Sequence, residues 1–162
     1  MANVNRRDLI TILAALGMSA TASASQRDGE QNAGSGKGMK LGRVYATPDG
    51  ESHIGDLEIP LTENQGRPLF FNSARFGATT VGFQRVRAGG ETAWHNPSQR
   101  WLAMILSGTW EIEVSDGTRR QFPAGSVSLV EDTFGKGHRG RAVGDSEVLV
   151  ASVMLNPEQR IG

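Results

Sequence analysis

Three side chains of this sequence stand out as candidates to move a proton: His95, Glu131 and His138. His95 follows a glycine pair and a tryptophan, and His138 ends an eight-residue run, EDTFGKGH, that begins with Glu131. An imidazole acts as a base or a hydrogen-bonding group near neutral pH, and a neighbouring carboxylate can orient its ring. We therefore treat these three residues as candidate catalytic groups.

Each candidate also has a plainer interpretation. His95 could bond only to a backbone carbonyl at a turn, and the run ending at His138 could be a glycine-rich turn in which Glu131 and Lys136 form a solvated ion pair. His53 is expected to have a structural role or to make a contact between subunits. The sequence leaves both alternatives open for His95 and His138.

Several other side chains could surround a ligand. Arg100 could hold an anionic group through a charge-assisted contact, or be an exposed residue at a strand end. Trp101 offers a ring for stacking. Met104, Trp110 and Phe83 could line an apolar pocket, although core packing alone accounts for them.

The elements that must position these groups are expected to be strands. Apolar runs bounded by Ser107-Gly108, Asp116-Gly117 and a Pro-Ala-Gly turn at 123–125 are typical of short strands joined by tight turns. Such strands at close spacing predict an all-β sandwich or barrel with little helix. The expected strands are 42–47, 52–61, 69–73, 78–87, 100–107, 109–114, 126–131, 138–143 and 147–155, with a polar loop at 62–68.

Alternation assigns faces to two of these strands. In 109–114, Trp110, Ile112 and Val114 share one face, and Glu111 and Glu113 share the other. The strand 100–107 is apolar on both faces, which predicts burial on both sides, as in a barrel wall.

The central stretch, 89–132, resembles the cupins, a family of small jelly-roll β-barrels. The first cupin motif is matched by Gly89, His95 and Gly108, and the second by Gly117, Pro123 and Gly125. The run ending at His138, and the spacing from His95 to Arg100, are also similar to a subgroup of small single-domain cupins. The resemblance implies a barrel with His95 at its mouth.

The resemblance departs from the family at the metal ligands. The second histidine of the first motif falls on Pro97 and its glutamate on Trp101, while the histidine of the second motif falls on Ser128 and its asparagine on Asp132. Trp101 would fill the space of the metal, and Ser128 joins the expected ligand-binding residues. No metal ligand is assigned, and a remodelled site from His95, His138 and Glu131 stays the alternative.

Composition narrows the choice of partners. The 162 residues have a formal net charge of zero, and the basic residues are spread along the chain, so no nucleic-acid partner is expected. There are no cysteines, which excludes disulfides, thiolate metal sites and cysteine nucleophiles. No phosphate-binding loop, dinucleotide fingerprint or Ser-His-Asp signature is present.

The first 24 residues are typical of an export signal. Arg6-Arg7 precedes a short apolar run at 9–16 and an Ala-Ser-Ala site at 22–24, and the arginine pair resembles a twin-arginine signal. We expect cleavage after Ala24, a flexible tether at 25–38 and a barrel domain at 39–162. The apolar run is too short for a comfortable membrane span of ~20 residues. The mature form is expected in the periplasm or outside the cell, without a stable membrane anchor.

Together these features predict an exported cupin-type barrel that binds a small organic molecule, with a homodimer expected from the family resemblance. Whether the protein is an enzyme is left open. One hypothesis is a metal-independent isomerase or lyase using His95 with Glu131 and His138. The others are a metal-dependent oxygenase or isomerase with an unusual ligand set, and a binding module without catalysis; the sequence specifies no cofactor.

Overall fold

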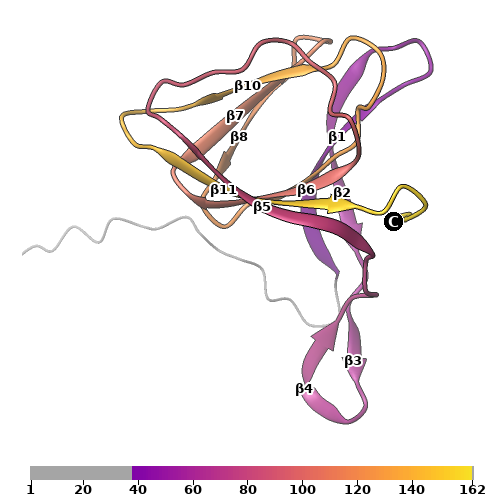
Figure 1. The fold of residues 1–162 in the computed structure, drawn as a ribbon. Coiled ribbons are helices and arrows are strands. Elements are labelled where there is room, and N and C mark those ends of the chain that lie inside the picture. The colour runs from indigo at the N-terminus through magenta and orange to yellow at the C-terminus, as the bar shows by residue number, and fades with distance from the viewer. Residues whose placement is uncertain (1–37, 162) are drawn as a thin grey trace, which may run out of the picture. The chain divides into compact units, whose positions relative to one another are not determined.

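A computed structural model describes residues 38–161, which fall within one compact unit, Gly34–Gly162. These residues form strands and no helix, so the expected all-β class is confirmed (Figure 1). The expectations for the export signal, and for the tether up to residue 37, lie outside the described residues. The strands are β1 (Met39–Ala46), β2 (Ser52–Ile59), β3 (Thr62–Asn64), β4 (Arg67–Asn72), β5 (Ala78–Val86), β6 (Trp101–Ser107), β7 (Thr109–Val114), β8 (Arg119–Pro123), β9 (Val127–Val130), β10 (His138–Ala142) and β11 (Val148–Leu155).

Two sheets face each other. The larger has six strands in the order β2-β1-β9-β6-β11-β5, and the smaller has three in the order β10-β7-β8. The pairing of β1 with β9 is parallel, and the other pairings are antiparallel. The loop after β5 extends the smaller sheet, because Glu91 bridges to Arg141 and His95 bridges to His138.

Tight glycine turns make these connections short. Gly108 joins β6 to β7 with a φ of 74°, and a Cβ on it would lie 2.6 Å from the carbonyl oxygen of Glu147. Gly117 joins β7 to β8 with a φ of 88°. Only glycine adopts this backbone region without strain, so the turns recognised in the sequence have a direct geometric cause.

The main core lies between the two sheets. Its buried members come from both sheets, and include Val44, Ile105, Ile112, Phe122 and Val150. A second cluster lies on the outer face of the large sheet, built around Leu102, Leu129 and Leu155. Because alternate residues of β6 contribute to the two clusters, the prediction that this strand is buried on both sides is confirmed.

Two polar regions were predicted incorrectly. The expected loop at 62–68 contains β3 and the start of β4, which form a hairpin. Strand β8 was not expected, because its residues are basic or polar apart from Phe122 and Pro123. This strand lies at the edge of the smaller sheet, and its one buried apolar residue is Phe122.

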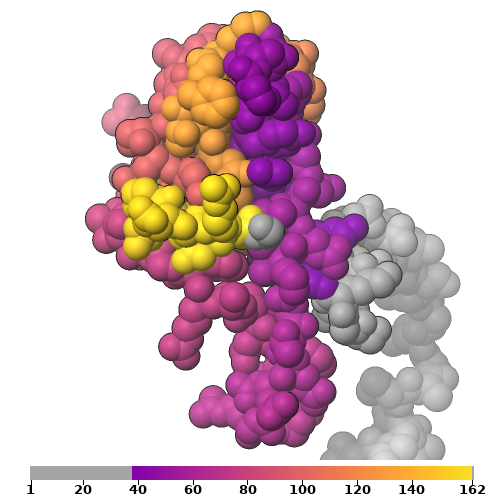
Figure 2. Space-filling model, turned by 90° about the vertical axis from the view of Figure 1, so that its right-hand side faces the viewer, coloured from indigo at the N-terminus to yellow at the C-terminus, as the bar shows by residue number. Residues whose placement is uncertain are grey.

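The β3–β4 hairpin stands apart from the two large sheets. Its strands pair with each other and with no other described strand. In Figure 1 it extends away from the barrel, and in Figure 2 it forms a separate magenta projection. No helix long and apolar enough to cross a membrane occurs between residues 38 and 161.

Candidate functional site

A cavity of about 110 Å³ opens into the space between the two sheets. Its walls combine apolar side chains, two indole rings and two imidazoles, with no carboxylate, lysine or arginine. Its volume is below the roughly 150 Å³ of an apolar cavity that binds benzene, so a ligand enclosed here would be small. The lining residues are Gln84, Val86, Thr92, His95, Trp101, Ala103, Ile105, Trp110, Ile112, Val130, His138, Gly140 and Val150.

One wall of the cavity depends on a glycine. Gly140 lies on β10 directly behind the indole of Trp110, and a Cβ on Gly140 would lie 2.3 Å from a ring carbon of Trp110. The absence of a side chain at Gly140 therefore admits the indole, which in turn forms part of the cavity wall.

Backbone pairing brings the two histidines together, although they are 43 positions apart in sequence. The amide of His95 donates to the carbonyl of His138 at 2.9 Å, and the amide of His138 donates back at 3.0 Å. Directly paired residues of antiparallel strands place their side chains on the same face. The ring centroids are accordingly 4.7 Å apart, with the planes tilted by 53°.

The loop before β10 is fitted closely to this pair. Gly137 has a φ of 74°, and a Cβ on it would lie 2.3 Å from the carbonyl oxygen of His95. The side chain of Asn96 donates to the carbonyls of Asp132 and Phe134, at 2.8 and 2.9 Å. These contacts fasten the 132–137 loop to the segment that carries His95.

A buried carboxylate orients the inner imidazole. Asp132 is fully buried and accepts a hydrogen bond from Nδ1–H of His138 at 2.8 Å, and another from the hydroxyl of Ser52 at 3.1 Å. His138 is also buried and lines the cavity. With Nδ1 bonded to Asp132, the Nε2 on the other side of the ring is the nitrogen left for a ligand.

The outer imidazole is held differently. His95 is exposed at the cavity mouth, and its Nδ1–H donates to the carbonyl of Ala93 at 2.9 Å. Its Nε2 is therefore also left without a protein partner among the described residues. Both interpretations of His95 from the sequence are thus present together: its ring bonds a backbone carbonyl and also lines the cavity.

Glu131 lies elsewhere. Its side chain accepts a hydrogen bond from Nε of Arg43 at 2.5 Å and lies 3.2 Å from Nε of Arg100. The Arg100 N–H is not directed at that oxygen, so the second contact is an ion pair without a hydrogen bond. Neither Glu131 nor Arg100 lines the cavity, and the carboxylate beside His138 is Asp132.

The other predicted ligand-binding residues divide between the two faces of the large sheet. Trp101 lines the cavity. Met104 packs against the outer cluster, and so faces away from the cavity. Ser128 is buried and pairs with Ala103, but it does not line the cavity.

The remaining charged and imidazole groups form surface contacts. His53 bonds to Asp116 at 2.6 Å and to the hydroxyl of Thr47 at 3.1 Å, which is consistent with its expected structural role. Lys136 pairs with Glu51, so the suggested pair between Lys136 and Glu131 does not form.

The donors of the cupin metal site do not assemble here. Of the four family positions only His95 is a ligand type, since Pro97, Trp101 and Ser128 occupy the others. Within residues 38–161, no group of three or more His, Cys, Asp or Glu side chains is arranged to hold a metal. The residues present therefore do not fit the metal that the resemblance implies.

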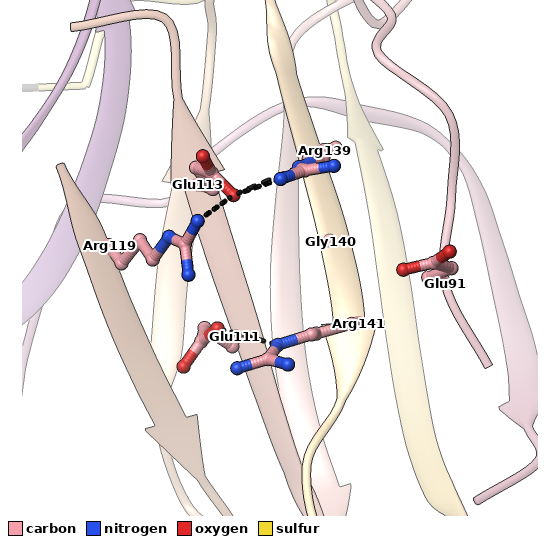
Figure 3. Close-up of a pocket in the computed structure, with 7 residues that line it drawn as sticks. All are labelled: Glu91, Glu111, Glu113, Arg119, Arg139, Gly140 and Arg141. Carbon is pink, nitrogen blue, oxygen red and sulfur yellow. Dashed lines mark hydrogen bonds and ion pairs between the residues drawn. The ribbon is translucent and has the colours of Figure 1, made fainter. Parts of the chain in front are cut away.

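Ion pairs cover the outer face of the smaller sheet (Figure 3). Glu113 on β7 lies between Arg139 on β10 and Arg119 on β8, at 2.8 and 3.1 Å, and Glu111 bonds to Arg141 at 2.7 Å. Hydrogen bonds from the arginines, that of Arg141 to Glu111 and that of Arg139 to Glu113, hold the pKa of each glutamate below its usual value. The expected alternation along β7 is confirmed, and the pairs fix β10, which begins at His138, against β7.

Asp132 is the member of the cluster around His138 that the sequence did not indicate. It falls at the asparagine position of the second cupin motif and was noted only as a departure from that motif. A short glycine-rich turn separates Asp132 from His138, which could have indicated that the two side chains meet. However, Glu131 also precedes that turn, so the sequence offers two carboxylates for one contact. The alternation of side chains along the strand decides between these two carboxylates. Val130 points into the core and Glu131 points outward, so Asp132 points inward, toward His138.

No family model matches the chain, and no curated protein matches it. Solved structures similar to the chain include a cupin 2 conserved barrel domain protein from Salinispora arenicola, at 24% identity over 47% of this chain and 61% of that one, with a TM-score of 0.40. A cupin domain from Bordetella pertussis aligns at 23% identity over 52% and 99%, with a TM-score of 0.39.

A double-stranded β-helix protein from Klebsiella pneumoniae aligns at 19% identity over 51% of this chain and 66% of that one, with a TM-score of 0.41. The description of the fold therefore rests on the strand pairing and on the core between the two sheets. The chain is an all-β protein of two facing sheets. Its specific likeness to cupins lies in the residues that match the two cupin motifs: Gly89, His95, Gly108, Gly117, Pro123 and Gly125.

Proposed function

We propose that this protein binds a small, neutral, largely apolar organic molecule between its sheets and transfers a proton on it. The observation that carries the proposal is the buried Asp132–His138 pair, which leaves Nε2 of His138 to the cavity, beside a second imidazole, His95. In this arrangement one imidazole removes a proton while the other, when protonated, donates one.

The cavity composition supports a neutral ligand. No Asp, Glu, Lys or Arg lines it, so a charged molecule would lose its hydration without gaining a counter-charge. Arg100, a candidate anion-binding group from the sequence, is paired with Glu131. The indoles of Trp101 and Trp110 supply flat apolar walls, which suit a ring or a planar unsaturated group.

Proton abstraction next to a carbonyl, leading to isomerisation or elimination, is the reaction class that two imidazoles can support without further groups. Asp132 is the positioning residue in this scheme: it fixes the tautomer of His138 and stabilises the imidazolium once His138 has taken the proton. Glu131 has no role in it, which revises the residue assignment made from the sequence.

Exchange of carbon-bound protons with solvent tests this chemistry without knowledge of the natural substrate. Cyclohexanone is neutral, close to benzene in size and has exchangeable α-protons. Incubated in D₂O with the protein, it should exchange faster than in buffer. His138→Asn and His95→Asn should each slow the protein-dependent exchange by about 10²-fold or more. His53→Asn, a matched surface histidine, should leave the rate unchanged.

Binding is measured separately through the fluorescence of the tryptophans. Ala103→Leu fills the cavity and should abolish the response to cyclohexanone, whereas Met104→Leu, on the opposite face of the same strand, should not. Binding without exchange would indicate a non-catalytic binding module. Absence of binding by the wild-type protein would contradict the proposal altogether.

We also propose that the protein is exported, with residues 1–24 removed. The support is the order of the arginine pair, the apolar run and the Ala-Ser-Ala site in the sequence. Loss of Arg6, Arg7 and Asp8 from 17 basic and 17 acidic residues leaves 15 and 16, so the mature form stays close to neutral.

A further inference from the structure

Removal of a proton next to a carbonyl leaves negative charge on the carbonyl oxygen, and the cavity must supply a hydrogen-bond donor for that oxygen. The hydroxyl of Thr92 is already bonded to the backbone of Gly140. The Nδ1–H groups of the two imidazoles are bonded as well. Three lining side chains have N–H groups that make no hydrogen bond within residues 38–161: Gln84, Trp101 and Trp110.

The indole of Trp110 lies against β10, the strand that begins at His138. A Cβ on Gly140 would lie 2.3, 2.5 and 2.6 Å from Cζ2, Cε2 and Nε1 of Trp110, so the nitrogen-bearing edge of the ring occupies the space of a side chain at position 140. That nitrogen remains accessible. The one fully enclosed side-chain nitrogen or oxygen without a partner in the described chain is Nε of Arg100.

This position places the indole N–H next to the inner imidazole. His138 and Gly140 are two positions apart on β10, so they face the same side of the strand and are about 6.6 Å apart. A carbonyl group and its α-carbon can bridge a gap of this size with a contact of about 3 Å at each end. The other two free donors, Gln84 on β5 and Trp101 on β6, belong to the opposite sheet.

We propose that Trp110 is a further catalytic residue, whose Nε1–H donates a hydrogen bond to the carbonyl oxygen of the ligand and stabilises the enolate. The inference rests on the proposed proton transfer, and it narrows the ligand to a ketone or aldehyde with an α-hydrogen. Nε2 of His138 takes the α-proton. The electron pair of the broken C–H bond then forms a carbon–carbon double bond, and the carbonyl π pair moves onto the oxygen beside Trp110.

Return of a proton to the α-carbon, from an imidazolium that has exchanged with solvent, restores the carbonyl compound. An indole suits this step in a cavity without charged walls, because it is uncharged and can only donate. His138 and Gly140 are both buried, and a donor in a site with little water stabilises developing charge more strongly than one in bulk water. Gly140 is the positioning residue, since it acts through Trp110.

Indole ¹H–¹⁵N spectra of the full chain test the contact without a measurement of activity. The chain has three tryptophans, so the indole signals can be assigned by single substitutions to phenylalanine. Addition of cyclohexanone should move the N–H proton signal of Trp110 downfield, as a new hydrogen bond does. Cyclohexane, which has the same ring without the oxygen, should leave that signal in place.

Trp110→Phe keeps an aromatic wall and removes the N–H. At saturating cyclohexanone it should slow the protein-dependent exchange by about 10²-fold, the effect of losing one such donor. Trp101→Phe makes the same change in the opposite sheet and should slow the exchange far less. Trp94→Phe, at an exposed tryptophan that stacks on Arg139 and does not line the cavity, should leave the rate unchanged. Circular dichroism confirms that each variant is folded.

This inference and the proposed proton transfer fail in different ways. Exchange by Trp110→Phe at the wild-type rate would overturn the inference and leave the proton transfer standing. A downfield shift at Trp101 in place of Trp110, or an equal shift of Trp110 with cyclohexane, would also overturn it. A cyclohexanone-specific shift of Trp110 without any exchange would support the carbonyl contact and contradict the proton transfer. Absence of both the shift and the exchange would overturn both.

Discussion

The chemistry of this molecule depends on which carboxylate reaches His138. Adjacent residues Glu131 and Asp132 have opposite surroundings: Glu131 turns outward to two arginines, and Asp132 turns inward to His138 and Ser52. A buried carboxylate with two donors is fixed in place, and it fixes the imidazole that it contacts. The candidate catalytic group is therefore oriented by the fold before any ligand arrives.

Asp132→Ala should destabilise the protein by about 1–3 kcal/mol, because it leaves Nδ1–H of His138 and the Ser52 hydroxyl without their acceptor in a buried site. The midpoint and slope of urea unfolding give this free energy directly. Asp145→Ala, at an exposed turn, should change it by less than about 0.5 kcal/mol. Equal effects of the two substitutions would contradict the role assigned to Asp132.

The candidate residues could be found from the sequence, but their grouping could not. His95 and His138 were identified as a candidate pair, and the structure joins them through one antiparallel bridge. Arg100, Met104 and Glu131 are near the same strands in sequence, yet they point away from the cavity. A shift of one residue along a strand reverses the face, so motif spacing alone cannot separate the two groups.

At the level of elements, strands with an apolar period were predictable and polar strands were not. Strand β7 was predicted with its observed bounds and faces, because its apolar and charged residues alternate. Strands β3 and β8 were missed, since their pairing is set by neighbouring strands rather than by their own side chains. The charged face of β7 also explains how the smaller sheet is held together, because Glu111 and Glu113 form ion pairs with arginines of β8 and β10.

Glu111→Gln should lower stability at neutral pH and change its acid dependence. Since the Arg141 hydrogen bond depresses the pKa of Glu111 from 4.5, the ionised carboxylate stabilises the fold above that pH. This contribution is lost as the pH falls below 4.5 through the lower pKa of the folded state. The difference in unfolding free energy between wild type and Glu111→Gln should therefore be constant from pH 7 to 5 and shrink below 4.5.

Arg141→Gln removes the same interaction from the other side and should show the same acid dependence. The double variant should then be less destabilised than the sum of the two single variants. Strict additivity, or a difference that grows as the pH falls, would contradict the pairing of Glu111 with Arg141.

At the scale of the whole molecule, the two faces of strand β5 have different surroundings. The inner face of β5 contributes Gln84 and Val86 to the cavity, and its outer face leaves Val81 and Phe83 exposed. The expectation of a homodimer rests on the family resemblance and stays a prediction. Core packing was expected for Phe83, but 70% of its surface is exposed. The sequence does not show this, because exposure of an apolar residue is a property of the assembled sheet.

Export is a prediction at the scale of the whole molecule. Protein recovered from the periplasm or medium of a bacterial host should begin at Ser25, since the Ala-Ser-Ala site ends at Ala24. Intact mass spectrometry measures the loss of residues 1–24. Replacement of Arg6-Arg7 by two lysines should block export if the twin-arginine route is used, without changing the fold of the retained protein. An uncleaved chain confined to the cytoplasm would contradict this prediction.

The central claim is that His95 and His138, alone among the three histidines, present Nε2 to a cavity that takes a small neutral molecule. Long-range ¹H–¹⁵N spectra of the imidazoles at pH 8 measure this most directly, with and without saturating cyclohexanone. We expect the Nδ1–H tautomer for His95 and His138, and shifts of both Nε2 signals on addition of cyclohexanone, while the signals of His53 stay unchanged. Unmoved signals of His95 and His138, or an Nε2–H tautomer at His138, would contradict it.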